Sequence, residues 1–348
     1  MSAPKGKSSM SAPSPLTGVI LLNMGGPDSL SAIRPFLARL FSDRELIRLP
    51  LASLTQPLFA WIVSGLRARH VRKYYEEIGG GSPIAEWTDR QRASLEKALC
   101  ETGENFRVYV GMRYWHPLAK HAVLEMKKDG VARAVALPLY PQYCAATTGS
   151  SLSDLRRWMR WAKTDFPLEE VTSWPDNAGY IAALCAKIGE TLEGTPDTGK
   201  THLLFSAHGV PRSFIDGGDP YQVEVEKTVA GVRKRLPEIS HSISYQSRLG
   251  RTEWLKPDTV EEVIRLGRDG VKRLIVVPVS FVSDHIETLH ELDIRLRKTA
   301  REAGIATFLR VPALNDSPAF IGALKEIVLA RLAEDTHSTG NLNSVVSP

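Results

Sequence analysis

Two short stretches of the sequence combine histidine with carboxylates in a way that suits proton transfer or metal binding. The run SDHIETLHELD contains Asp284, His285, Glu287 and Glu291, directly after an apolar segment. If a helix begins near Asp284, the three carboxylates fall at positions i, i+3 and i+7 on one helical face. The helix dipole explains acids in a first turn but explains Glu291 poorly. This crowding of like charges therefore indicates a site for a cation or for protons.

The second stretch, LLFSAHGVP, ends an apolar run with His208 and enters a Gly-Val-Pro loop. A lone histidine in such a place can simply cap a turn. Opposite a carboxylate, however, imidazole suits proton abstraction because it titrates near neutral pH. Imidazole also binds ferrous iron. His208 and the carboxylates near Glu287 are therefore candidates for one shared site.

Both stretches follow apolar runs that predict buried β-strands. Six such runs alternate with longer helical segments, at 18–27, 107–117, 131–143, 201–211, 241–250 and 271–285. Strands that alternate with helices predict an α/β fold of parallel sheets with crossover helices. In open parallel sheets ligands bind beyond the carboxyl ends of the strands. The chemical residues lie at those ends.

One pattern occurs twice along the chain. KKDGVARAVALPLYPQY and GRDGVKRLIVVPVSFVSDH each join a helix, an Asp-Gly turn and a buried strand. We therefore predict two similar Rossmann-like domains, each a parallel sheet flanked by helices, over residues 17–172 and 173–317. A helix over 318–335 is expected to pack across the pair. The polar ends, 1–16 and 336–348, are expected to be a disordered and a loose tail.

The composition narrows the class of protein. The 348 residues include 43% hydrophobic and 24% charged residues, as in ordinary globular proteins. The net charge of +5 is spread along the chain without a basic run, so no nucleic-acid partner is expected. Cys100, Cys144 and Cys185 form no CxxC pair, which suggests free thiols in a reducing compartment.

An uncharged segment at 49–66 lies within a candidate membrane-facing lip, residues 46–70. Its prolines and polar residues argue against an uninterrupted transmembrane helix, and basic residues flank it. One interpretation is an interfacial amphipathic segment with Phe59 and Trp61 entering lipid. The alternative is an internal core helix or a dimer contact.

Other predicted strand ends supply walls and rims for a ligand. Met24 suits packing on a flat apolar ligand. Arg113 and Tyr114 follow one strand, and Trp254 follows another. Ser150 lies in a hydroxyl-rich loop that suits a carboxylate, although helix capping explains the same hydroxyls. Together, aromatic walls, basic rims and an acid/histidine centre fit a dicarboxylic tetrapyrrole.

On these residues the chain resembles the ferrochelatases, which insert ferrous iron into a porphyrin as the last step of haem synthesis. The resemblance covers about residues 18–329. It rests on several runs in order: LLNMGGP, IGGGSPI, GMRYWHPL, YPQYCAATTGSSL, LLFSAHGVP, GDPYQVEV, YQSRLGRTEWLKP and SDHIETLHELDI. It implies a chelatase-like fold of two similar domains.

The resemblance also implies roles for single residues. His208 matches the family's essential histidine and Glu287 its essential carboxylate, with His285 as a further catalytic residue. The implied porphyrin-binding residues are Met24, Arg113, Tyr114, Ser150, Trp254 and Phe281. The implied ligands of Fe2+, which enters as a substrate, are His208, Glu287, Asp284 and Glu291. We expect His208 and Glu287 to face each other across a slot shaped for the tetrapyrrole.

Within the family, Met24 and the apolar lip favour protoporphyrin IX as substrate over coproporphyrin III. The lip also implies a bacterial, cytoplasmic protein bound peripherally to the inner-membrane lipid surface, with an upstream porphyrinogen oxidase as a possible partner. Some members hold a [2Fe–2S] cluster through C-terminal cysteines. Because no cysteine follows Cys185, no iron–sulfur cluster is expected here.

The implied reaction requires two pyrrole protons to leave before iron can enter, which favours a bent macrocycle. His208 is the expected proton acceptor, while Glu287 carries iron or relays protons; the reverse division stays open. Two alternatives remain. One is a non-catalytic tetrapyrrole carrier. The other is an iron oxygenase using His208, His285 and Glu287, which disagrees with the α/β alternation.

Overall fold

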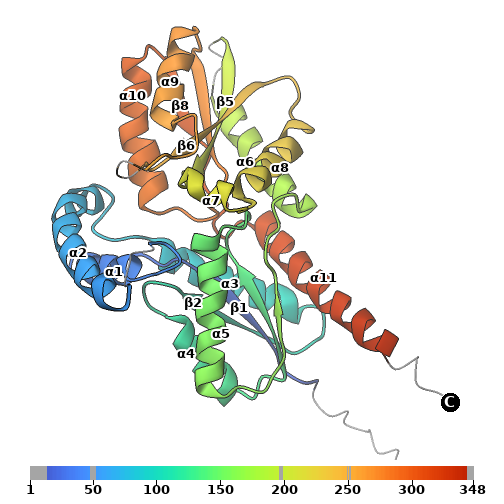
Figure 1. Ribbon diagram of the computed structural model, residues 1–348. Coiled ribbons are helices and arrows are strands. Elements are labelled where there is room, and N and C mark those ends of the chain that lie inside the picture. The colour runs from blue at the N-terminus through green and yellow to red at the C-terminus, as the bar shows by residue number, and fades with distance from the viewer. Residues whose placement is uncertain (1–13, 48–51, 196–198, 249, 251, 343–348) are drawn as a thin grey trace, which may run out of the picture.

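The computed structural model describes residues 14–47, 52–195, 199–248, 250 and 252–342. It contains two four-stranded parallel sheets, each with helices packed beside it (Figure 1). In the view of Figure 1 the second sheet lies above the first, and the lip helices project to one side. The predicted α/β fold with two similar parallel sheets is confirmed.

The first sheet has the strand order β2-β1-β3-β4. Its strands are β1 (Thr17–Asn23), β2 (Phe106–Met112), β3 (Arg133–Pro138) and β4 (Leu168–Glu170). The helices of this half are α1 (Ile33–Phe41), α2 (Ala52–Glu77), α3 (Ile84–Cys100), α4 (Ala119–Lys128) and α5 (Ser150–Ala162), with a short π-helix, η1 (Ala145–Gly149). The central strand β1 is buried along its whole length, as expected for a parallel sheet covered on both faces.

The second sheet repeats this arrangement with the order β6-β5-β7-β8. Its strands are β5 (Thr201–His208), β6 (Ser240–Gln246), β7 (Arg273–Pro278) and β8 (Thr307–Arg310). The helices are α6 (Ala178–Glu193), α7 (Arg212–Asp216), α8 (Tyr221–Arg233), α9 (Thr259–Arg268), α10 (Arg297–Glu302) and α11 (Pro318–Leu342), with a π-helix, η2 (Glu287–Leu296).

The two sheets also agree in register. Thr17 of β1 lies opposite Arg133 of β3, and Thr201 of β5 lies opposite Arg273 of β7. Each central strand therefore starts with a threonine paired to an arginine, and each ends beside a glycine-containing loop. The functional residues lie beyond these ends, as parallel sheets require.

One hydrophobic core joins the two halves. It includes Val19 and Leu21 of β1, Phe205 of β5, Tyr180 of α6 and Phe320 of α11, all essentially inaccessible to solvent. α11 packs on α6 and α3, and Figure 1 shows it leaving the junction and running alongside the first half. A shared core of this kind fixes the relative position of the two sheets. The helix reaches Leu342, beyond the expected 318–335, and residues 343–348 lie outside the description, as do 1–13.

The lip region forms the helix pair α1 and α2, which encloses a smaller core of its own. Phe59 packs edge-to-face on Phe41, with ring centroids 6.4 Å apart, so it faces this core rather than solvent. Leu58, Trp61 and Leu66 are each more than 60% exposed. Within the described part of the chain, no helix has the length and apolar character that crossing a membrane requires. Residues 48–51 of the predicted lip lie outside the description.

Candidate active site

His208 is the last residue of β5, and the following glycine determines how closely the chain can turn. A Cβ atom on Gly209 would lie 2.6 Å from the carbonyl oxygen of Gln246 and 3.3 Å from Cε3 of Trp254. The Gly209 amide donates to that same carbonyl at 2.8 Å. Only glycine permits this approach, which brings the Trp254 ring beside the loop that carries His208.

The carboxylates come from the segment that follows β7. η2 begins at Glu287, and its wide π-helical turns hold Glu287 and Glu291 close enough for their charges to interact. π-Helical segments are rare and are often found at functional sites. The sequence predicted an α-helix from about Asp284, whereas the structure has a π-helix that starts three residues later, at Glu287.

His208 and Glu287 are in direct contact. Nδ1 of His208 lies 2.9 Å from Oε2 of Glu287, and the two side chains are 36% and 17% exposed. A carboxylate can only accept, so Nδ1 carries the hydrogen. In neutral His208, Nε2 is then the free acceptor. The two groups were expected to face each other across a slot, but at this distance no porphyrin ring can lie between them, so that expectation is wrong.

The contact changes the acidity of both groups. Burial disfavours the charged form of His208, but the charge and hydrogen bond of Glu287, with a contribution from Glu291, outweigh burial and raise the pKa of His208. Burial likewise opposes ionisation of Glu287, yet His208 and His285 hold its pKa far below the usual range. The contact therefore favours imidazolium and carboxylate more strongly than either group would favour its charged form alone.

Glu291 has the opposite tendency. Its burial, followed by the nearby charge of Glu287, raises its pKa. Oε2 accepts a hydrogen bond from Oγ of Ser247 at 2.6 Å. Ser247 has φ of +68°, which is uncommon for a residue other than glycine. Such strain often occurs at functional positions, and here it directs a hydroxyl at the carboxylate.

His285 and Phe281 flank the pair. Nε2 of His285 lies 3.9 Å from Oε2 of Glu287, and its Nδ1 lies 3.0 Å from the carbonyl oxygen of Ser283. The Phe281 ring centroid lies 4.5 Å from that of His285 and 6.0 Å from that of His208. The aromatic ring therefore contacts both histidines and limits how they can turn.

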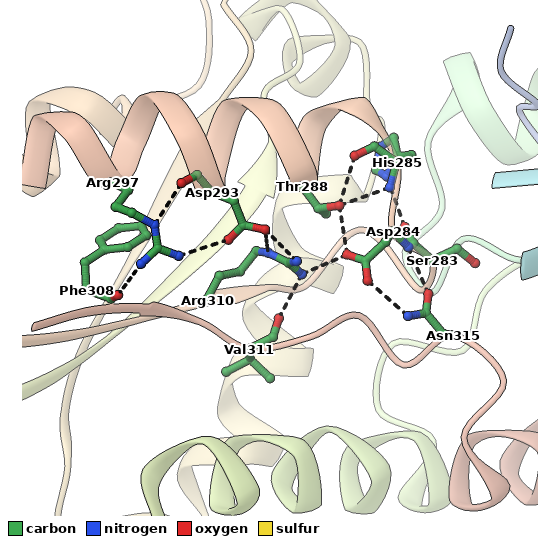
Figure 2. Close-up of polar contacts among 10 residues, drawn as sticks. All are labelled: Ser283, Asp284, His285, Thr288, Asp293, Arg297, Phe308, Arg310, Val311 and Asn315. Atoms are coloured by element: carbon green, nitrogen blue, oxygen red, sulfur yellow. Dashed lines mark hydrogen bonds and ion pairs between the residues drawn. The ribbon is translucent and has the colours of Figure 1, made fainter. Parts of the chain in front are cut away.

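Asp284 does not join this group. Its Oδ1 accepts from Thr288 at 2.9 Å and from Arg310 at 2.8 Å, and Oδ2 accepts from Asn315 at 3.0 Å (Figure 2). Arg310 also binds Asp293 of η2, nine residues after Asp284. The carboxylate that was expected among the iron ligands thus lies in a structural network that fastens η2 to β8.

Arg113, Tyr114 and Ser150 meet around Asp43, a residue that the sequence reasoning missed. Asp43 Oδ2 accepts from Arg113 at 2.9 Å, from Tyr114 at 2.6 Å and from Ser150 at 2.5 Å. Burial opposes ionisation of Asp43, but these donors together with the Glu45 amide lower its pKa. The expected ligands of a substrate carboxylate are therefore oriented by a buried carboxylate of the protein.

Two cavities border the candidate residues. One of about 370 Å³ is lined by Asp43, Arg113 and further charged residues of both signs, including Arg44 and Arg157. The other, of about 440 Å³, lies along the glycine-rich loop after α2 and reaches Asp284. Met24 is half-buried and packs against the α1–α2 core that also contains Tyr114.

The structure thus brings together His208, Glu287, Glu291 and His285, with Phe281 and Trp254 beside them. Arg113, Tyr114 and Ser150 form a separate cluster. Asp43 lies outside the runs that carry the family resemblance, and Ser247 lies within one of them, YQSRLGRTEWLKP, but a single serine there gives no signal of its own. The unusual φ of Ser247 is visible only in three dimensions, and Asp43 is a single acid in a loop.

Comparisons with known proteins agree with this architecture. The family model described as Ferrochelatase matches residues 16–332. A ferrochelatase from Gloeothece citriformis is 47% identical over 331 residues, covering 92% of this chain and 84% of the relative. A ferrochelatase from a Synechocystis species is 46% identical over 321 residues, covering 90% and 82%.

A solved structure shares the fold at low sequence identity. SirB from Bacillus subtilis, solved with Fe3+, matches with a TM-score of 0.56 at 10% identity, covering 92% of this chain and 97% of that one. At this identity the likeness concerns the arrangement of the two sheets alone. The family match over nearly the whole chain and the close relatives go further, and they show that this chain belongs to the ferrochelatase family.

Proposed function

We propose that this protein is a lyase that inserts Fe2+ into protoporphyrin IX and so forms protohaem, the last step of haem biosynthesis. The observation that carries the proposal is the direct contact between His208 and Glu287, with Glu291 and His285 beside it. These side chains supply a base, carboxylates and an imidazole at one edge of the second sheet. Membership of the ferrochelatase family supports the reaction class.

In this mechanism Nε2 of His208 accepts one pyrrole proton. Glu287 holds the hydrogen on Nδ1, so the lone pair of neutral His208 is on Nε2. The same carboxylate stabilises the imidazolium that forms, which makes His208 a stronger base. Glu291, whose pKa is raised, is the group best suited to take the second proton.

Iron reaches the ring from the side of these acids. Glu287, Glu291 and His285 offer oxygen and nitrogen donors of the kind that ferrous iron accepts. The exchange balances, because one Fe2+ enters the macrocycle as two protons leave it. Because His208 and Glu287 touch, the macrocycle lies to one side of the pair, and base and metal donors approach the same face.

We assign one porphyrin propionate to the cavity at Arg113. Asp43 and Ser150 fix the guanidinium of Arg113. Arg44 and Arg157 line the same space together with Glu45 and Asp154, and Arg157 is paired with Asp154. Guanidinium groups bind carboxylates with defined geometry. Met24 and Trp254 are then the apolar contacts of the porphyrin ring. The Tyr114 hydroxyl donates to Asp43, and Asp43 in turn accepts from Arg113.

We also propose that α2 attaches the enzyme peripherally to a lipid surface. Leu58, Trp61, Ile62 and Leu66 recur at helical spacing and are all exposed. Exposed apolar side chains on a helix that also carries basic residues are typical of interfacial binding. A lipid-bound lip would give an apolar porphyrin a short path from the membrane.

An anaerobic insertion assay tests the substrate. Fe2+ is supplied with protoporphyrin IX in one series and with coproporphyrin III in the other, and formation of the metalloporphyrin is followed by absorbance. The proposal predicts a clearly higher kcat/KM with protoporphyrin IX. Preference for coproporphyrin III would overturn the substrate assignment, and porphyrin binding without insertion of Fe2+ or Zn2+ would indicate a carrier.

A further inference from the structure

His290 lies between Glu287 and Glu291 in the sequence of η2 but faces a different neighbour. Its side chain is 3% exposed, and Nε2 lies 2.9 Å from Oε2 of Glu77, near the end of α2. Because a carboxylate only accepts, Nε2 carries the hydrogen and donates it. One turn of η2 thus presents carboxylates to His208 and an imidazole to the lip helix.

The lip helix holds this imidazole with more than one side chain. The Tyr74 ring lies against His290, with centroids 4.2 Å apart at an interplanar angle of 33°. The Tyr74 hydroxyl lies 3.0 Å from Nε2 of His70, which fixes the tyrosine from the preceding turn. His290, Tyr74 and Glu77, here called the lip clamp, therefore form a stacked and hydrogen-bonded contact between α2 and η2.

The clamp has a counterpart on the other side of η2. Thr288 donates to Asp284, and Asp293 binds Arg310 of β8, as Figure 2 shows. η2 is thus fastened to its own sheet through one face and to α2 of the first half through another. Tyr75, the neighbour of Tyr74, is close enough to Glu287 for that charge to act on it.

We propose that His290 is a positioning residue that sets the distance between the lip helix and the carboxylates of η2. α2 contributes the apolar wall shared with Met24, and η2 contributes Glu287 and Glu291. A porphyrin that contacts both elements binds best at one separation of the two. The lip clamp fixes that separation without touching the reacting atoms.

The test compares four single variants and the double variant Glu77→Ala/His290→Ala in full-length protein. Glu77→Ala removes the acceptor from a half-exposed position, so folding is preserved, and His290→Ala removes the donor. His290→Gln keeps an N–H donor of similar reach. Glu76→Ala is the matched control, because Glu76 pairs with Arg72 on its own helix at 2.9 Å. Affinity for metal-free porphyrin is read from fluorescence quenching, and KM and kcat from Zn2+ insertion.

We expect Glu77→Ala and His290→Ala each to weaken porphyrin binding by about threefold to tenfold, mainly through KM. The double variant should be no weaker than His290→Ala alone, because both changes break one contact. His290→Gln and Glu76→Ala should stay near wild type. Unchanged porphyrin affinity in Glu77→Ala and His290→Ala, or fully additive losses in the double variant, would overturn the proposal. The porphyrin used is whichever the wild-type enzyme prefers, so the result is independent of the substrate assignment.

Discussion

Nδ1 of His208 lies 2.9 Å from Oε2 of Glu287, although 79 residues separate them in the chain. The contact joins the last residue of β5 to the first residue of η2, the π-helix in the segment after β7. It also couples the two groups, since each favours the charged form of the other. Replacing Glu287 therefore lowers the base strength of His208, and replacing His208 makes Glu287 a weaker acid.

Replacing either member of this pair should nearly abolish metal insertion. His208→Ala removes the proton acceptor, and Glu287→Gln removes the charge that strengthens it, so each should lower kcat by about a hundredfold or more. Zn2+ insertion and porphyrin fluorescence quenching measure turnover and binding separately. His241→Ala, on the adjacent strand β6, is the control. Near-normal turnover in both variants would show that the assignment is wrong.

The pH profile should respond to Glu291. The reaction needs neutral His208, and because the pKa of His208 is raised above 6.5, activity should appear only as pH rises through that higher value. Glu291→Gln removes the group proposed to take the second proton, so kcat should fall. It also removes one negative charge near the imidazole, so the acid limb of the remaining kcat/KM should move to lower pH by about half a unit. The exposed Glu261→Gln should leave the limb in place. A limb that is unmoved or shifted upwards in Glu291→Gln contradicts the proposed base.

The Asp284–Arg310 pair should contribute to stability rather than to chemistry. Their side chains are 12% and 8% exposed, so Arg310→Ala leaves a buried carboxylate without its cation. The expected loss in free energy of unfolding is about 3–5 kcal/mol, measured by urea denaturation. Arg72→Ala, in an exposed pair, should cost less than about 1 kcal/mol. Equal losses in the two variants would contradict this account of Asp284.

Gly209 offers a test of the turn after β5. Gly209→Ala places a Cβ 2.6 Å from a backbone oxygen, so the loop and Trp254 must shift. We expect a loss of about 1–3 kcal/mol in stability together with weaker porphyrin binding. Gly189→Ala is the matched control, since it lies in α6 with open space around it and should be neutral or stabilising. If the two variants melt at the same temperature, the close approach is not essential.

Much of the fold follows from local sequence patterns. All six runs expected to be strands are strands, and five of them are apolar and largely buried between helices. The sixth, β6, reads SHSISYQ and is buried only over its last three residues. β4 and β8 were not predicted. They have three and four residues at sheet edges, and such short segments carry too little pattern to distinguish them from loops.

The candidate site was predictable only where residues adjoin a strand end. His208 and Arg113 have that signal, and Glu287 belongs to the run of titratable residues in the segment after β7. The Asp284 side chain binds Arg310, which follows 26 positions later, instead of joining Glu287. Its orientation also depends on where the π-helix starts, which residue spacing does not reveal. Asp43 contacts Arg113 from 70 residues away. Long-range pairing of this kind leaves no periodicity in the sequence.

The matching registers of the two sheets have a chemical consequence. Counting from Thr17 and Thr201, which hold equivalent places, Met24 in the first half corresponds to His208 in the second, and Gly25 and Pro27 correspond to Gly209 and Pro211. The molecule is thus a pseudo-symmetric pair whose halves carry side chains of different chemistry at this position. A thioether neither gives nor takes a proton at neutral pH, so only the imidazole half can do acid–base work, and the sulfur half is left to offer van der Waals contact.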